Sequence, residues 1–161
     1  MLNIKKTVDF SDRKLIVNIS DVSRSHDKIN RLIQQIEAVL TDGNIITDIE
    51  ITNADCSNQE LLGFVIFKIA LRYLEHLKKL EFNLLRCRQE DFTVLCESLR
   101  VQSRFLQSVS FKVNDIGDIG VRQLVSCGFK FIVCLKLDCN RITSEGARSI
   151  SEAGWTYLSN L

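Results

Sequence analysis

The chain has 161 residues, of which 45% are hydrophobic and 25% charged. This composition is that of an ordinary globular domain, and it excludes wholesale disorder, a collagen-like repeat and a coiled coil. The 21 Lys and Arg residues nearly balance the 20 Asp and Glu residues, whereas a dedicated nucleic-acid-binding domain carries a basic excess. We therefore expect one domain over residues 1–161, with no nucleic-acid partner.

The N-terminal segment predicts a cap over residues 1–13. Leu2, Ile4, Val8 and Phe10 are apolar positions that would cover the first part of the core. Ser11-Asp12-Arg13 would turn the chain into a short hairpin. The N-terminal lysines are not followed by an apolar stretch of signal-peptide length, so no secretion signal is readable.

After the cap, one template of strand, turn and helix returns about five times. Each unit opens on two apolar positions that flank a single residue, the alternation of a short strand with two different faces. The units lie near residues 14–45, 46–76, 77–105, 106–131 and 132–161. Their paired apolar positions are Val17 and Ile19, Ile49 and Ile51, Leu80 and Phe82, Val109 and Phe111, and Leu135 and Leu137.

Helices are predicted after the strands. From Ile29 to Leu40 the apolar residues recur at helical spacing. Ser57-Asn58-Gln59-Glu60 fits a capping box before the apolar run 61–71, which is too short to cross a membrane and reads as a buried helix. Asp118 and Thr143 are suitable N-caps for the last two helices.

The last two units match one another most closely. Their segments Val109-Ser110-Phe111-Lys112-Val113-Asn114-Asp115-Ile116 and Leu135-Lys136-Leu137-Asp138-Cys139-Asn140-Arg141-Ile142 lie 26 residues apart, and Gly120 and Gly146 follow at the same interval. This pattern resembles the leucine-rich repeat family, and within it the ribonuclease-inhibitor-like class. The resemblance implies an α/β fold: a right-handed solenoid, an arc of about five strand–helix units with a parallel sheet on its concave face.

The resemblance also implies a structural role for two asparagines. In the family, a repeat asparagine bonds neighbouring turns in a ladder, and Asn114 and Asn140 match that position. Leu85, Ala54 and Val22 occupy it in the earlier units, which therefore depart from the family's pattern.

The strand pattern defines a candidate binding surface. Neighbouring strands lie about 4.8 Å apart and packed helices about 8–10 Å apart, so stacked strand–helix units close the strand side into a concave surface, which solenoids use to bind partners. We expect the side chains between the inward apolar positions to line it. They are Asp48, Glu50, Thr52, Lys79, Glu81, Asn83, Ser108, Ser110, Lys112, Cys134, Lys136 and Asp138, with Ile16, Asn18 and Ser20 in the first unit.

This row runs from acidic in the second unit to basic in the fourth, and the family's use of such a face predicts a non-enzymatic module that binds a protein. Catalysis has no motif support, because His26 and His76 fall in different units without partners and no HExxH, GxSxG or phosphate-binding loop occurs. We expect no cofactor and no membrane partner.

The cysteines predict packing rather than chemistry. No pair has the CxxC spacing, and only two histidines accompany them, so no metal site is expected. Without a secretion signal we expect reduced thiols that pack as small apolar groups, in a cytoplasmic protein. The six are Cys56, Cys87, Cys96, Cys127, Cys134 and Cys139.

Three alternatives stay open. The stretch 45–67 resembles a strand, loop and helix start of an anti-sigma-antagonist-like regulatory domain, with Ser57 as the candidate phosphorylated residue. A secreted effector could use the same repeat in a host cytosol. Leu158 and Leu161 have the spacing that opens another strand, so the C-terminal edge either folds back as a cap, belongs to a longer array or supports self-association.

Overall fold

Six strands form one sheet in the computed structural model, which describes residues 8–11, 13–18, 26–41, 45–52, 76–83, 89–102 and 104–161. The strands lie side by side in chain order: β1 (Val8–Ser11), β2 (Lys14–Asn18), β3 (Asp48–Thr52), β4 (Lys79–Asn83), β5 (Ser108–Ser110) and β6 (Cys134–Lys136). β1 is antiparallel to β2, and β2 to β6 are all parallel. The predicted α/β class with a parallel sheet is confirmed.

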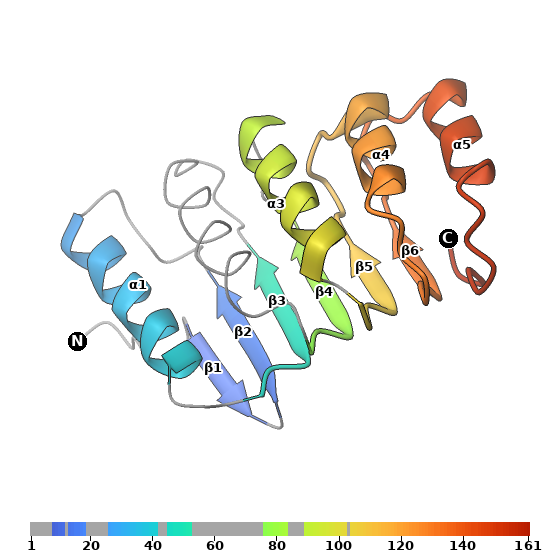
Figure 1. Ribbon diagram of the computed structural model, residues 1–161. Coiled ribbons are helices and arrows are strands. Elements are labelled where there is room, and N and C mark those ends of the chain that lie inside the picture. The colour runs from blue at the N-terminus through green and yellow to red at the C-terminus, as the bar shows by residue number, and fades with distance from the viewer. Residues whose placement is uncertain are drawn as a thin grey trace.

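The described helices lie on one side of this sheet (Figure 1). They are α1 (His26–Thr41), α3 (Gln89–Gln102), α4 (Gly117–Ser126) and α5 (Ser144–Ser151). The helix predicted to begin after Ser57 lies outside the described residues. Helix α4 contacts α3 on one flank and α5 on the other, so the helices of the last three units pack against their neighbours.

The predicted hairpin is present at the N-terminus. Strands β1 and β2 pair from Val8 with Val17 to Ser11 with Lys14. Arg13 turns the chain in the left-handed region, with a φ of 66°. Leu2 and Ile4 of the predicted cap lie outside the described residues.

Alternating side chains place the core between the sheet and the helices. In β3 and β4, half-buried and buried residues alternate along each strand. Burial of the apolar face is nearly complete, since Leu80 and Val109 are 0% exposed and Phe82 1%. The helices add apolar residues at helical spacing, such as Phe92, Leu95 and Leu99 of α3, each 1% exposed. Hydrophobic burial between these layers is the main stabilising term.

The alignment predicted for the first unit is wrong by two residues. Leu15 and Val17 pair with Ile49 and Ile51, and both are fully buried. The prediction had instead matched Val17 and Ile19 to that pair. Both registers place apolar residues at alternate positions. The pattern therefore predicts the correct face of the strand but not which of its residues pair with Ile49 and Ile51.

The turns after β5 and β6 share one backbone conformation. Val113 and Cys139 have φ values of 57° and 58°, and Asp115 and Arg141 follow with 60° and 55°. This left-handed region is unfavourable for residues other than glycine, most of all for β-branched valine. Two identical turns 26 residues apart show that the repeat extends to the backbone.

Gly120 and Gly146 allow the helices to approach these turns closely. A Cβ at Gly120 would lie 2.5 Å from Ile116 Cβ, and one at Gly146 would lie 2.4 Å from Asp118 Oδ1 and 2.6 Å from Ile142 Cγ2. Both contacts are closer than real Cβ atoms tolerate. The repeated glycine is therefore a packing requirement near the start of α4 and of α5.

One of the two predicted helix caps is confirmed and the other is wrong. Thr143 is the N-cap of α5, and its hydroxyl accepts from Glu145 N–H at 3.2 Å. Asp118 lies inside the first turn of α4, whose N-cap Ile116 makes no side-chain cap. Instead, Asp118 accepts from the backbone N–H groups of Thr143 (2.8 Å) and Gly146 (3.1 Å), so it caps the helix of the next unit.

Candidate functional site

The uncovered face of the sheet carries polar side chains in rows that cross the strands. One row runs through Lys14, Asp48, Lys79, Ser108 and Cys134, which are paired from strand to strand. A second runs through Ile16, Glu50, Glu81, Ser110 and Lys136. A third joins Thr52 and Asn83, and the backbone of Asn18 pairs beside Thr52. The structure thus places the predicted strand residues at alternate positions of one face, whereas Ser20 lies outside the described residues.

Two ion pairs connect the first row to the second, and a third joins residues that follow β5 and β6. The pairs are Lys14 with Glu50 (2.8 Å), Lys79 with Glu81 (3.0 Å) and Lys112 with Asp138 (3.1 Å). The hydrogen bond from Lys112 holds the pKa of Asp138 below its usual range. The hydrogen bond to Glu50 raises the pKa of Lys14 in the same way. Each pair is partly exposed to solvent, so each adds little to stability.

Lys14 was missed by the sequence prediction because of the two-residue shift in the first unit. Its ammonium group lies against Glu50, which weakens the acidic character expected in the second unit. Toward the other end, Lys136 is exposed and forms no ion pair within the described part of the chain. The face is therefore a mixed-charge surface that is most basic around Lys136.

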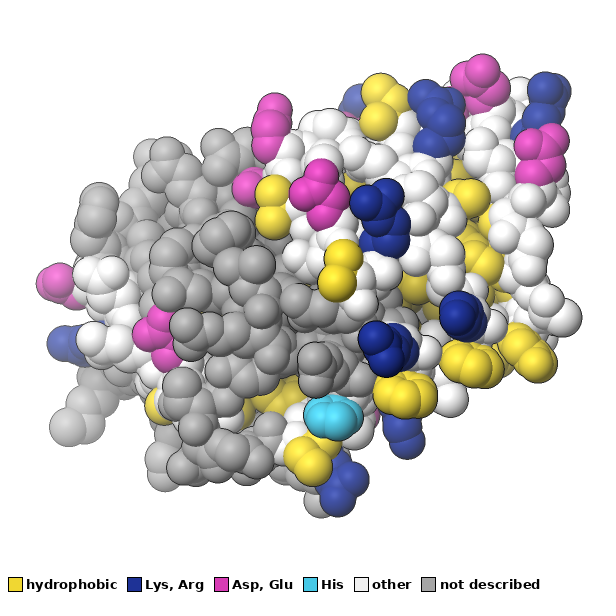
Figure 2. Space-filling view, in the orientation of Figure 1, with side chains coloured by type: hydrophobic (Ala, Val, Ile, Leu, Met, Phe, Trp, Pro, Cys, Tyr) yellow, Lys and Arg dark blue, Asp and Glu magenta, His cyan; other side chains and the backbone are white. Residues whose placement is uncertain are grey.

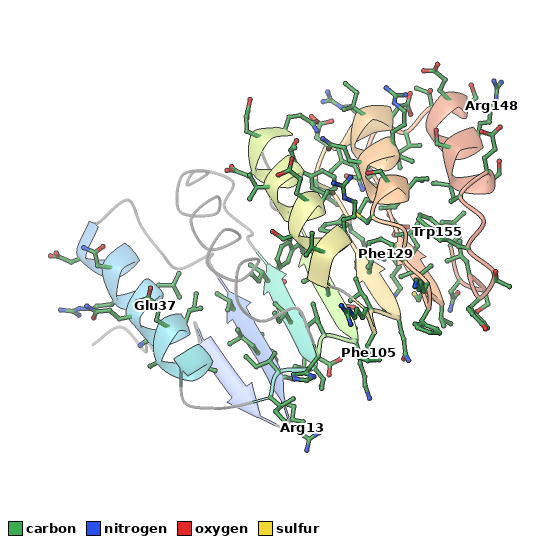
Figure 3. The ribbon with its side chains drawn as sticks, in the orientation of Figure 1. Arg13, Glu37, Phe105, Phe129, Arg148 and Trp155 are labelled. Carbon is green, nitrogen blue, oxygen red and sulfur yellow. The ribbon has the colours of Figure 1, made fainter. Side chains whose placement is uncertain are left out.

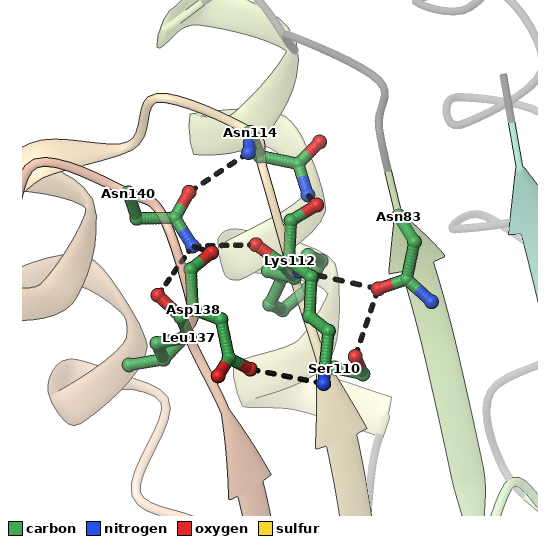
Figure 4. Close-up of polar contacts among 8 residues, drawn as sticks. Asn83, Ser110, Lys112, Asn114, Leu137, Asp138 and Asn140 are labelled. Atoms are coloured by element: carbon green, nitrogen blue, oxygen red, sulfur yellow. Dashed lines mark hydrogen bonds and ion pairs between the residues drawn. The ribbon is translucent and has the colours of Figure 1, made fainter. Parts of the chain in front are cut away.

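Two of the predicted face residues hold the sheet together. Asn83 Oδ1 accepts from the Ser110 hydroxyl at 2.8 Å and from Lys112 N–H at 3.1 Å (Figure 4). Ser110 is only 2% exposed, so its hydroxyl is not available to a partner in this conformation. Strand alternation predicted correctly which face the Ser110 side chain lies on, but it did not predict that this side chain is buried.

Asn114 and Asn140 lie buried in the turns, at 1% and 2% exposure. Asn140 Oδ1 accepts from Asn114 N–H at 2.9 Å, and its Nδ2 donates to the carbonyl groups of Phe111 (2.6 Å) and Leu137 (2.8 Å) (Figure 4). Asn114 Nδ2 donates to Phe82 O, one unit further back, at 2.5 Å. Each asparagine thus satisfies backbone groups of its own turn and of the preceding unit.

The described cysteines fall into two environments. Cys96 and Cys127 are buried, and the Cys127 thiol donates to Cys96 O and Gln123 O at 3.3 Å each. Cys134 is half-buried on the strand face and Cys139 is exposed in the left-handed turn. Cys56 and Cys87 lie outside the described residues.

The described residues contain neither a metal-binding cluster nor a membrane-spanning helix. No three His, Cys, Asp or Glu side chains in those ranges come together closely enough to hold a metal ion. Over the same ranges, no helix has both the length and the apolar character needed to cross a bilayer. His76 is exposed, in the loop before β4.

Asp118 makes part of the stability depend on pH. The Thr143 hydroxyl donates to its carboxylate at 2.6 Å, and this bond, with the Thr143 and Gly146 N–H groups, lowers its pKa. A lowered native pKa stabilises the fold above about pH 4, the value in the unfolded chain, and that contribution disappears as pH falls through the native pKa. Asp118→Asn should therefore make the unfolding free energy fall less steeply below about pH 4.

Urea denaturation across this acid range measures the effect, with Glu152→Gln as an exposed control. The lowered pKa of Asp138 adds a slope of the same sign, so wild type and Asp118→Asn should differ in steepness while both still lose stability. Identical slopes for the two proteins would contradict a role for the Asp118 cap.

Comparison with known families gives one match. A family model described as Leucine Rich repeat matches residues 130–151, which include β6 and the whole of α5. The match supports a leucine-rich repeat family for the chain. No curated protein matches it.

Proposed function

We propose that this chain is a non-enzymatic protein–protein interaction module, a right-handed leucine-rich-repeat solenoid of the ribonuclease-inhibitor-like class. The observation that carries the proposal is the uncovered face of the parallel sheet. Parallel sheets are usually covered on both sides, yet the described helices lie on one side only (Figure 1). A second polypeptide is the natural cover for the exposed rows of polar side chains.

Unit dimensions support the curved shape. Strand neighbours need about 4.8 Å and helix neighbours about 8–10 Å, so the strand face becomes the concave one. The helical layer and the 26-residue spacing of the last two turns support the ribonuclease-inhibitor-like class. A leucine-rich repeat family suggests protein binding.

The proposed contact residues are those that the face leaves accessible. Lys136 and Asp138 are exposed, while Lys112, Cys134 and Ser108 are half-buried beside them. Asp48, Glu50, Thr52, Lys79, Glu81 and Asn83 extend the surface across β3 and β4 and are also half-buried. Ser110 acts beneath the surface by positioning Asn83.

Charge reversal at the basic end tests this assignment. The double variant Lys112→Glu/Lys136→Glu should weaken partner binding by about tenfold or more. The new carboxylates would repel acidic groups of a partner that is complementary to the two lysines. Folding should change little, since the Lys112–Asp138 pair is exposed and exposed ion pairs add little to stability. Partners recovered from cytosolic extract with the wild-type chain are titrated against each variant, and circular dichroism checks the fold.

The matched control reverses two charges on the helical side, Arg122→Glu/Arg148→Glu. Unchanged binding for the strand-face variant, together with lost binding for this control, would move the interface to the helices. It would also refute the proposed use of the concave face.

The strand order disfavours the regulatory-domain alternative. Strands β2 to β6 follow chain order and are all parallel, as repetition of one unit requires. Ser57, its candidate phosphorylated residue, lies outside the described residues.

Three further expectations stay predictions: a cytoplasmic location, use as a secreted effector, and self-association through the C-terminal edge. At that edge, Leu161 is 76% exposed and Asn160 already bridges to Cys134.

A further inference from the structure

The loops that lead into the strands are stacked as regularly as the strands themselves. Lys78 N–H donates to Thr47 O at 2.7 Å, Gln107 N–H to Lys78 O at 2.8 Å, and Val133 N–H to Gln107 O at 2.8 Å. Ser159 N–H continues the series to Val133 O at 3.0 Å. One backbone ladder therefore holds these loops in register along the edge of the sheet.

Two residues before each ladder position, the chain exposes a large side chain. We call this row the aromatic rim, and it consists of Ile45 (49% exposed), His76 (exposed), Phe105 (53%), Phe131 (45%) and Tyr157 (57%). The residue that follows each of the first four is buried: Ile46, Leu77, Leu106 and Ile132 are at most 3% exposed. Anchoring that residue in the core forces the preceding side chain outward.

The rim forms a visible stripe on the surface. Figure 2 shows hydrophobic and basic side chains gathered along the lower edge of the molecule, and Figure 3 places Phe105 at that edge, below the strands. The rings of Phe131 and Tyr157 stack, with centroids 6.2 Å apart and planes 29° apart. Exposed apolar groups aligned in this way mark interaction sites more often than isolated ones do.

Cations flank the aromatic rim. Lys78, Arg104 and Lys130 are exposed, and none forms an ion pair within the ranges that the structure describes. The described loop residues before β3 to β6, at 45–47, 76–78, 104–107 and 127–133, include no carboxylate. These described loop residues are therefore apolar and positively charged, in a chain whose net charge is only +1.

We propose that the aromatic rim binds an extended acidic segment of a protein partner. Apolar side chains of that segment would contact Phe105, Phe131 and Tyr157, and its carboxylates would pair with Arg104 and Lys130. The rim presents one large side chain from each successive loop, so it suits an extended chain that crosses the loops better than a lipid plane. Beside it, the ladder residues Lys78, Gln107 and Ser159 are polar, and Val133 is 41% exposed. Single-stranded nucleic acid needs a longer basic groove than three cations provide.

A labelled peptide of alternating glutamate and leucine tests the proposal by fluorescence anisotropy. The wild-type chain should bind it more weakly as salt rises. Arg104→Glu/Lys130→Glu and Phe131→Ser/Tyr157→Ser should each reduce affinity by about tenfold or more. Matched controls on the helices, Ile119→Ser and Arg148→Glu, should bind as wild type does, and so should Lys112→Glu/Lys136→Glu on the strand face.

That last variant separates this inference from the proposed function, because it tests the strand face alone. Absence of peptide binding, or equal binding by all variants, would refute the proposal. So would equal affinity for a peptide of alternating lysine and leucine. Rim-dependent binding to phosphatidylserine vesicles or to oligothymidine, without binding to the glutamate–leucine peptide, would assign the rim to lipid or nucleic acid instead.

Discussion

Replacing Asn140 by alanine is expected to lower the free energy of unfolding by about 3–5 kcal/mol. The substitution leaves Asn114 N–H and the carbonyl groups of Phe111 and Leu137 without their partner. Each buried polar group left unsatisfied costs about 1–3 kcal/mol, and water has little access, since Asn140 is 2% exposed. Urea denaturation followed by circular dichroism measures the loss.

Asn160→Ala is the matched control, because the Asn160 side chain is exposed near the end of the chain. It should change stability by no more than about 0.5 kcal/mol. Asn140→Asp should not recover the loss, because a carboxylate oxygen would replace the Nδ2 donor against the carbonyl oxygens of Phe111 and Leu137 in a buried site. A cost below about 1 kcal/mol for Asn140→Ala would show that the turn does not depend on this side chain.

The sequence predicts best where the repeat is exact. Between the last two units, the apolar positions of the template agree at an interval of 26 residues, and the turns, the buried asparagines and the close glycines follow the same interval. Residues such as Asn114 or Gly120 can be read because each meets a strict local need. Asn114 supplies hydrogen bonds inside a buried ladder, and Gly120 lies where the helix leaves no room for a Cβ.

Alternation alone is less informative in the first unit. Leu15, Val17 and Ile19 all fit an apolar series, so a shift of two residues leaves the hydrophobic pattern intact. Only the pairing of Leu15 with Ile49 resolves the register. The missed Lys14 is a direct consequence, since its pairing with Glu50 depends on that register.

Contacts between units are harder still to predict from one sequence. The bond from Ser110 to Asn83 joins residues of different strands, and Asp118 caps a helix that begins in the following unit. Neither partner is marked by local spacing. The aromatic rim did leave a signal, because Phe105, Phe131 and Tyr157 recur at the 26-residue interval of the last units.

Phe111→Ala is expected to lower the free energy of unfolding by about 3–5 kcal/mol, the usual cost of emptying a phenylalanine site in a core. Phe111 is 1% exposed and meets Phe92 of α3 and Phe82 of β4 edge-to-face, with centroids 5.2 and 5.9 Å away. These contacts join the fourth unit to the strand and helix of the third. Such aromatic pairs add about 0.5–1.5 kcal/mol beyond the area they bury.

The control is the same substitution at Phe105, six residues earlier and 53% exposed. It should cost less than about 1 kcal/mol, because most of that ring already contacts water. Stacked units support only their neighbours, so Phe111→Ala should also speed amide hydrogen exchange in β4, α3 and β5. Equal losses for the two variants would contradict the assignment of Phe111 as the link between the third and fourth units.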